Sequence, residues 1–200
     1  MSSSMGRWYA YAVPSLLLLG VLALYMLSFP PHVQADGGAP NLAYVSGTSS
    51  GISVIDVGQA KVIRTIPVSG DPHTILLSAD GVALYVTQPA LEQVSVLAAK
   101  TGQVICTARV GGTPMLLALD QNTATLYAAG GGSTRVSALD AGNCSLKRIY
   151  ETGSPVYGLA ITLPGIGITH ATSGQLWVAG TQALTVFDDR AGQLLADGPQ

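Results

Sequence analysis

The strongest constraint on the fold of this chain is a sequence motif that recurs at a regular interval of roughly forty residues. Its tyrosines are almost evenly spaced, at Tyr44, Tyr85 and Tyr127. Serines between aliphatic residues keep the same interval, at Ser53, Ser95 and Ser137. Prolines after glycine-containing turns follow nearly the same spacing, at Pro72, Pro114 and Pro155. A period of this length indicates supersecondary units that stack to bury a shared core.

The pattern within one unit predicts strands rather than helices. The Asp80-Gly81 pair forms a tight turn between two apolar runs. Polar and apolar residues alternate after the next loop, which is the period of a strand. We expect four strands in this unit, at His73–Ser78, Val82–Thr87, Gln93–Leu97 and Gln103–Val110. Four short antiparallel strands per unit are typical of a propeller blade.

The sequence therefore predicts an all-β, β-propeller-like fold with about four blades. The units lie near residues 41–71, 72–113, 114–154 and 155–198. The first unit begins at its second strand, because nothing in residues 30–40 resembles the strand that opens at Pro72. We expect at most 15 strands in an incomplete or open arc, and this leaves sheet edges unpaired. Such a chain is expected to self-associate through its open blade edges, or to belong to a longer gene product.

One stretch of the second unit resembles a known repeat family. The run from Leu76 to Thr87, with its aspartate-glycine turn followed by leucine-tyrosine-valine-threonine, resembles the YVTN-type β-propeller repeat. Val54-Ile55-Asp56 is similar to the third strand of that repeat. The third unit departs from it at Asp120-Gln121-Asn122, and the last has Trp177 in place of tyrosine. The resemblance implies a propeller fold and relatives such as surface-layer, adhesion-like and exported binding proteins, with lactonase-like and redox-partner propellers among similar folds.

The N-terminus predicts export of the chain. The segment from Trp8 to Phe29 carries no charged residue and is long enough for one transmembrane helix. Arg7 before this segment favours a cytoplasmic N-terminus. Small residues at Val33-Gln34-Ala35 equally allow a cleaved signal peptide, so an anchor and a signal both remain open. Both predict an extracytoplasmic location for the repeats, after a proline- and glycine-containing linker at 30–40.

The amino-acid composition argues against nucleic acid as a partner and against a covalently bound haem. With a net charge of −2 and 10% charged residues, the chain has no basic surface of the kind that binds nucleic acid. Without a Cys-x-x-Cys-His sequence it has no covalent haem site. Cys106 and Cys144 occupy different registers of neighbouring units, near outer strands that diverge, so two unbridged thiols are favoured over a disulfide.

Among the ionisable residues, His73 is the best candidate for chemistry. It opens a first strand, which in a propeller lines the central channel, so it is a candidate channel residue. The matching positions in the next units are Met115 and Val156, and no ring of histidines forms. His170 and His32 are expected to be solvated, and histidines so dispersed predict no metal site.

The carboxylates follow the repeat more than any catalytic pattern. Asp56, Asp140 and Asp188 share one register, which predicts turn acceptors rather than acids or bases. Glu92 and Glu151 fall in expected loops. We therefore assign no catalytic, cofactor-binding or metal-binding residue and no cofactor.

The last unit has a longer connection between its first two strands, from Leu163 to Ser173. Ile166, Ile168 and His170 make it a candidate interaction loop, because apolar residues on a loop suggest a contact surface. A longer hairpin that continues the two strands is the alternative.

Three functions remain open at this point. The first is an exported, membrane-tethered, non-catalytic scaffold that binds a protein or ligand. The second is a lactonase-like or redox-partner enzyme with a site at the channel near His73, and the third is a propeller fragment without independent function. The fold alone does not choose among them.

Overall fold

The structure is a computed structural model that describes residues 41–48, 50–162 and 174–199. These residues belong to one compact unit, residues 37–200. The apolar segment 8–29, the linker 30–40 and the loop Leu163–Ser173 with Ile166, Ile168 and His170 lie outside the described residues. In the described part of the chain, no helix is long and apolar enough to cross a membrane.

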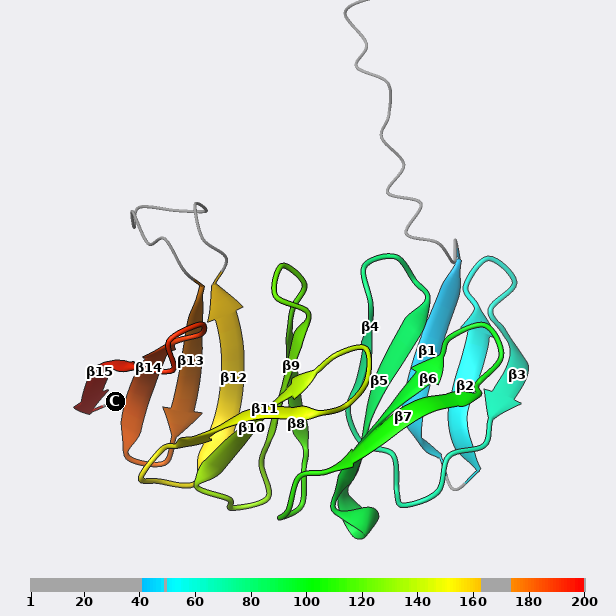
Figure 1. The fold of residues 1–200 in the computed structure, drawn as a ribbon. Helices are drawn as coiled ribbons and strands as arrows, with labels where there is room; N and C mark the ends of the chain where they lie inside the picture. The colour runs from blue at the N-terminus through cyan, green and yellow to red at the C-terminus, as the bar shows by residue number, and fades with distance from the viewer. Residues whose placement is uncertain (1–40, 49, 163–173, 200) are drawn as a thin grey trace, which may run out of the picture. The chain divides into compact units, whose positions relative to one another are not determined.

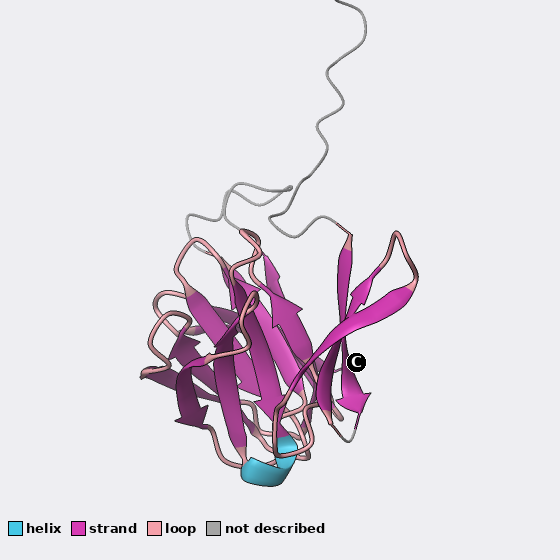
Figure 2. Cartoon of the chain, turned by 90° about the vertical axis from the view of Figure 1, so that its right-hand side faces the viewer, coloured by secondary structure: helices cyan, strands magenta, loops and turns pink. Residues whose placement is uncertain are grey.

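The described residues form antiparallel sheets in chain order (Figures 1 and 2). The first sheet has three strands: β1 (Leu42–Thr48), β2 (Gly51–Asp56) and β3 (Lys61–Ile66). The second has four: β4 (Ile75–Leu77), β5 (Ala83–Gln88), β6 (Gln93–Ala98) and β7 (Val104–Arg109), with the short 3-10 turn η1 (Pro89–Leu91) between β5 and β6.

The third and fourth sheets repeat this arrangement with four strands each. The third contains β8 (Leu116–Asp120), β9 (Thr125–Ala129), β10 (Arg135–Asp140) and β11 (Leu146–Glu151). The fourth contains β12 (Val156–Thr162), β13 (Gln175–Gly180), β14 (Ala183–Asp188) and β15 (Leu194–Pro199). In each, consecutive strands are hydrogen-bonded neighbours, which confirms the predicted all-β meanders and the three-stranded first sheet.

The strand pairing confirms that the repeated tyrosines are equivalent. Each lies in the second strand of its repeat unit and pairs with the same position of the third strand, as Tyr44↔Val54, Tyr85↔Val96 and Tyr127↔Ala138. Trp177 takes this position in the fourth sheet, opposite Val186. The period in the sequence is therefore a period in the structure.

The core lies between successive sheets rather than within any one of them. Alternation along a strand sends neighbouring side chains to opposite faces. On β5, Leu84 and Val86 pack toward the first sheet, with Ile52 and Val54. Tyr85 between them packs toward the third sheet. A further cluster joins the third and fourth sheets, through Tyr127, Val136, Tyr150, Leu176 and Phe187.

Every outer strand carries one β-bulge at the same register. The third and fourth strands of each unit shift by one residue, which leaves a single extra residue in the outer strand: Ile63, Ile105, Lys147 and Leu195. A bulge increases the local twist of a strand and redirects the residues beside it. The next residue in the first three units therefore reaches the neighbouring sheet. We call Arg64, Cys106 and Arg148 the cross-sheet residues.

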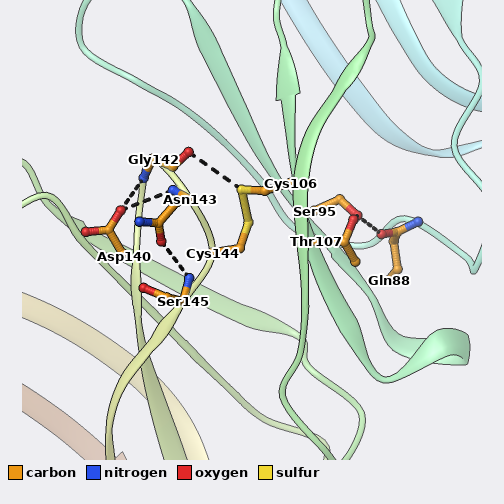
Figure 3. The surroundings of a disulfide bond; sticks show 9 residues. All are labelled: Gln88, Ser95, Cys106, Thr107, Asp140, Gly142, Asn143, Cys144 and Ser145. Atoms are coloured by element: carbon orange, nitrogen blue, oxygen red, sulfur yellow. Dashed lines mark hydrogen bonds between the residues drawn. A yellow bond between two sulfur atoms is a disulfide. The ribbon is translucent and has the colours of Figure 1, made fainter.

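The cross-sheet residues all contact one place, the turn between the third and fourth strands of the following sheet. The Arg64 guanidinium donates to the carbonyl oxygens of Ala99, at 3.0 Å, and Lys100, at 2.5 Å. The Arg148 guanidinium donates to the carbonyl oxygens of Ala191 and Arg190. Between them in the chain, Cys106 forms a disulfide bond with Cys144 in the corresponding turn (Figure 3).

The expectation of two unbridged thiols is therefore wrong. The two cysteines do occupy different positions of the repeat. A cross-sheet contact, however, joins an outer strand to a turn of the next sheet, so the two residues need not be equivalent. The Cα atoms of Cys106 and Cys144 are 5.8 Å apart, which is within the range that a disulfide spans. Cys144 takes a left-handed backbone conformation, with φ of 62°, in a turn fixed by Asp140. This turn holds its side chain next to Cys106.

Candidate functional site

The predicted candidate His73 lies exposed just before β4. Its carbonyl oxygen accepts a hydrogen bond from the Ser46 hydroxyl at 2.5 Å, and its Nδ1 lies 3.2 Å from the Thr74 hydroxyl oxygen. The Thr74 hydroxyl in turn donates to the carbonyl oxygen of Met115 at 2.5 Å. The bonds from Ser46 and Thr74 link β1 to the residues before β4, and the residues before β4 to the residue before β8. The structure brings no other ionisable side chain to His73 in the contacts we find among the described residues.

The recurring aspartates act as turn acceptors. Asp56 Oδ1 accepts the backbone N–H of Gln59 at 2.9 Å. Asp140 Oδ1 accepts from Gly142 and Asn143, and Asp188 Oδ1 accepts from Arg190 and Ala191. The hydrogen bond from the Gly142 backbone is the largest cause that lowers the pKa of Asp140. Across the described residues, no group of three or more histidine, cysteine or acidic side chains could hold a metal ion.

A cavity of about 240 Å³ lies between the third and fourth sheets. Its walls come from β9, β10 and β11 of the third sheet and from the turn that follows β14 in the fourth. The lining residues are Thr123, Thr125, Tyr127, Ala138, Lys147, Arg148, Tyr150, Asp189 and Arg190. Aromatic rings form one wall, and cationic side chains come from two elements.

Two carboxyl groups meet beside this cavity. Asp120, at the end of β8, is 1% exposed and accepts hydrogen bonds from the Asn122 backbone at 2.9 Å and the Thr123 hydroxyl at 2.7 Å. The Asp189 carboxyl lies within hydrogen-bonding reach of Asp120. Both Asp189 oxygens are buried and receive no hydrogen bond from a donor among the described residues. Two acceptors that face each other need a proton or a cation between them.

The pKa values of the two carboxyl groups are shifted in opposite directions. Burial is the main cause that raises the pKa of Asp189 to about 6, and the neighbouring Asp120 adds to it. Burial also acts to raise the pKa of Asp120, but hydrogen bonds from the Thr123 hydroxyl, Asp189 and the backbone outweigh it and lower that pKa. Asp120 is therefore the stronger acid of the pair, and Asp189 is the weaker one.

An aromatic cluster closes the inner side of the cavity. The rings of Tyr127 and Tyr150 lie 6.1 Å apart, and those of Tyr150 and Phe187 lie 5.0 Å apart. The Tyr150 hydroxyl donates to the backbone oxygen of Asp189 at 3.1 Å. Tyr127 is fully buried, and its hydroxyl has no hydrogen-bond partner among the residues that the structure describes. Burial, with Tyr150 and Asp189 close by, raises its pKa.

Lys147 and Arg148, which line the cavity, form their hydrogen bonds with groups other than the two carboxyls. The Lys147 ammonium donates to the carbonyl oxygens of Thr123 and Ala124 and to the Thr125 hydroxyl, each at 3.1 Å. It also lies 3.3 Å from Asp140 Oδ2. The Arg148 guanidinium holds the turn at Arg190 and Ala191 and lies 5.9 Å from the centre of the Tyr150 ring. Among the described residues, none of the three cationic side chains of the cavity, Lys147, Arg148 and Arg190, forms an ion pair with Asp120 or Asp189.

The corresponding junction between the second and third sheets lacks this carboxyl pair. A cavity of the same volume, about 240 Å³, is lined there by Ser78, Tyr85 and Ala141 among others. Ser78 pairs with Ala83 as Asp120 pairs with Thr125, one repeat later. Ala141 and Asp189 each donate their backbone N–H to the residue before a second strand, Ala124 and Gly174. Sequence reasoning missed this site, and the signal for it was a carboxylate at two repeat positions that hold Ser78 and Ala141 at the preceding junction.

A second surface feature lies on the fourth sheet. An open apolar cavity of about 410 Å³ is lined by Gly158, Leu159, Ala160, Thr162, Trp177, Ala179 and Leu184. Trp177 is the register equivalent of Tyr85 and Tyr127, whose rings are covered by the following sheet. No described sheet covers Trp177 on this face.

Comparison with known proteins places the fold and no more. No family model matches the sequence, and no curated protein matches it. A solved chain of Kuenenia stuttgartiensis hydrazine synthase matches with a TM-score of 0.65 and 19% identity, over 80% of this chain and 46% of that chain. A chain in a crystal structure of the mitotic checkpoint complex matches with a TM-score of 0.66 and 16% identity, over 81% of this chain and 50% of that chain.

The chain thus spans about half the length of these solved chains. At such identities the likeness shows a β-propeller-like fold, and one fold serves many unrelated functions.

Proposed function

We propose that this chain is an exported repeat protein of the YVTN type that acts as a non-catalytic interaction scaffold, tethered to a membrane by the apolar segment at residues 8–29. The motif around Asp80 and Tyr85 supports the family. The disulfide between Cys106 and Cys144 supports export, because such bonds persist in oxidising compartments. N-terminal sequencing of the mature protein tests the tether, since a chain that starts at Asp36 would have lost it.

The observation that carries the scaffold function is the apolar cavity on the fourth sheet, with Trp177 at its wall. At the equivalent positions, Tyr85 and Tyr127 are buried against the next sheet. The sheets pack on one another through one fixed register, so the occupant that matches this face is another sheet of the same repeat. A second copy of this chain supplies such a sheet, and we propose self-association as the binding mode.

Mutation of the cavity wall tests this proposal. In full-length protein, Trp177→Ser together with Leu184→Ser should shift the assembly toward monomer in sedimentation equilibrium, because both changes remove apolar area from the contact. Val104→Ser is the matched control, since Val104 is 63% exposed on β7 and away from this face.

The control variant should associate as the unchanged protein does. An unchanged protein that is monomeric at all concentrations, or a double variant that associates as strongly as the control, would show that this face is not the contact. The N-terminal segment is the same in all three proteins, so its own contribution cancels.

A further inference from the structure

We propose that the junction between the third and fourth sheets binds a single proton, which Asp120 and Asp189 share, and that loss of this proton weakens the attachment of the fourth sheet. The site is a pH-sensitive contact built from two carboxyl groups beside an open cavity. It differs in chemistry from the otherwise equivalent junction between the second and third sheets.

The repeat itself shows that the fold does not require these carboxyl groups. Ser78 takes the place of Asp120 in the second sheet. Ala99 and Ala141 take the place of Asp189 in the second and third sheets, and both are buried. A small neutral residue therefore satisfies the same backbone hydrogen bond. Two carboxyl groups at one junction are an addition to the repeat.

The contacts of the pair call for one proton. Asp120 already accepts two hydrogen bonds, from Asn122 and Thr123, and this stabilises its ionised form. The buried oxygens of Asp189 receive none from the described residues. If Asp189 keeps a proton it can donate to Asp120, whereas two neighbouring ionised carboxylates in this buried place repel each other with little water to screen them. The pair titrates as a unit, so its apparent pKa values belong to both groups.

The surrounding groups do not neutralise a second charge. On the same turn, Asp188 adds negative charge, and the Arg190 backbone N–H donates to Asp188 Oδ1 at 3.0 Å. Lys147 and Arg148 on β11 are held by carbonyl oxygens and by Asp140. Tyr127 on β9 and Tyr150 on β11 line the same cavity, and burial raises the pKa of both hydroxyls.

A proton fits this site better than a metal ion does. Oxygen-ligated cations such as Ca²⁺ take six or more ligands, commonly with several carboxylates. The described residues supply only two carboxyl groups here, and three cationic side chains line the same cavity. Asp189 lines this cavity, whereas both of its carboxyl oxygens are buried.

The direction of the pH effect follows from the two groups. The folded-state pKa of Asp189 is about 6, above the ordinary 3.8, so its stabilising contribution is complete below pH 3.8 and is lost as the pH rises through 6. The folded-state pKa of Asp120 is lowered, so its contribution is present above pH 3.8 and is lost as the pH falls below that value. The junction is most stable between these limits, with one proton on the pair.

Denaturant unfolding of the full-length protein at pH 5 and at pH 8 tests the inference. The folding equilibrium constant should fall between these values on the order of ten-fold more in the unchanged protein than in Asp189→Asn. The amide of that variant donates to Asp120 at both pH values. Asp189→Ala, which installs the residue found at Ala141, should also lose this pH dependence. Asp197→Asn removes a carboxylate of the same sheet outside the pair and should keep it.

Two results would overturn the inference. The first is an Asp189→Asn variant whose stability changes with pH as much as that of the unchanged protein. The second is a rise in the unfolding midpoint of the unchanged protein, but not of Asp189→Asn, when Ca²⁺ is added at pH 8, because this would identify a cation site instead. A ¹³C titration of the Asp189 carboxyl gives an independent measure, with a midpoint expected near 6.

Discussion

At the scale of single residues, the repeated tyrosine position shows that equivalent rings can have different surroundings. Tyr85 and Tyr127 occupy equivalent positions in β5 and β9, and both rings pack toward the following sheet. The Tyr127 hydroxyl is fully buried and has no partner among the described residues. A buried hydroxyl without a hydrogen bond loses its contacts with water and gains nothing in return. The ring of Tyr127 thus stabilises the junction while its oxygen weakens it.

Removal of that oxygen should increase stability. Tyr127→Phe is expected to raise the free energy of unfolding by about 0.5–1 kcal/mol, because the desolvation cost of the hydroxyl disappears. Tyr150→Phe is the matched control in the same aromatic cluster. It loses the hydrogen bond to the Asp189 backbone oxygen and should lower the free energy of unfolding by about 1 kcal/mol. Denaturant unfolding measures both, and a loss of stability in Tyr127→Phe would mean that its hydroxyl has a partner.

At the scale of strands and turns, the bulge in the outer strand determines which residue of a sheet contacts the next sheet. The bulge places Arg64, Cys106 and Arg148 against the next turn. An arginine holds that turn through carbonyl oxygens, and cysteine holds it through a covalent bond. The geometry is common to all three, whereas the chemistry of the link is set by a single residue.

The disulfide should be the strongest of these links. Replacement of both Cys106 and Cys144 by alanine is expected to lower the free energy of unfolding by about 2–4 kcal/mol, since the bond closes a long loop in the unfolded chain. Arg64→Ala removes two hydrogen bonds at an equivalent position and should lower it by about 1 kcal/mol. Equal losses for the two changes, or free thiols found by alkylation of the purified protein, would contradict this order.

The sequence predicts elements well and contacts between elements poorly. Strands such as Gln93–Ala98 follow from period-2 alternation and from turn residues next to them, both of which are local signals. The contact between Cys106 and Cys144 depends on a bulge, and a bulge leaves no mark in a hydrophobic pattern. The pair of Asp120 and Asp189 needs the register of two sheets and their packing as well. A search for equivalent positions at which neighbouring repeats carry different residues would have pointed to the cysteine pair and to the aspartate pair.

At the scale of the whole described unit, the sheets differ in how much of their surface is covered. The second and third sheets contribute residues to clusters on both faces, whereas the first and fourth contribute to one cluster each among the described residues. Local stability follows the apolar contacts that hold an element in place. The middle sheets should therefore be the last to open.

Hydrogen exchange measures this gradient. In dilute full-length protein, the backbone amides of β5, β6, β9 and β10 should exchange most slowly, because both of their faces are packed. Those of β2 and β14, which are central strands of the first and fourth sheets, are the matched comparison. Slower exchange in β14 than in β10 under conditions where the protein is monomeric would contradict the gradient.

The bond between the second and third sheets also has a mechanical consequence. Cys106 and Cys144 are 38 residues apart in the chain, so the segment between them stays closed when the ends of the protein are pulled. At about 3.4 Å per residue, this segment holds back roughly 130 Å of extension. When the protein is under tension, it would lengthen by that amount only after reduction, so the disulfide bond limits how far the chain can be stretched.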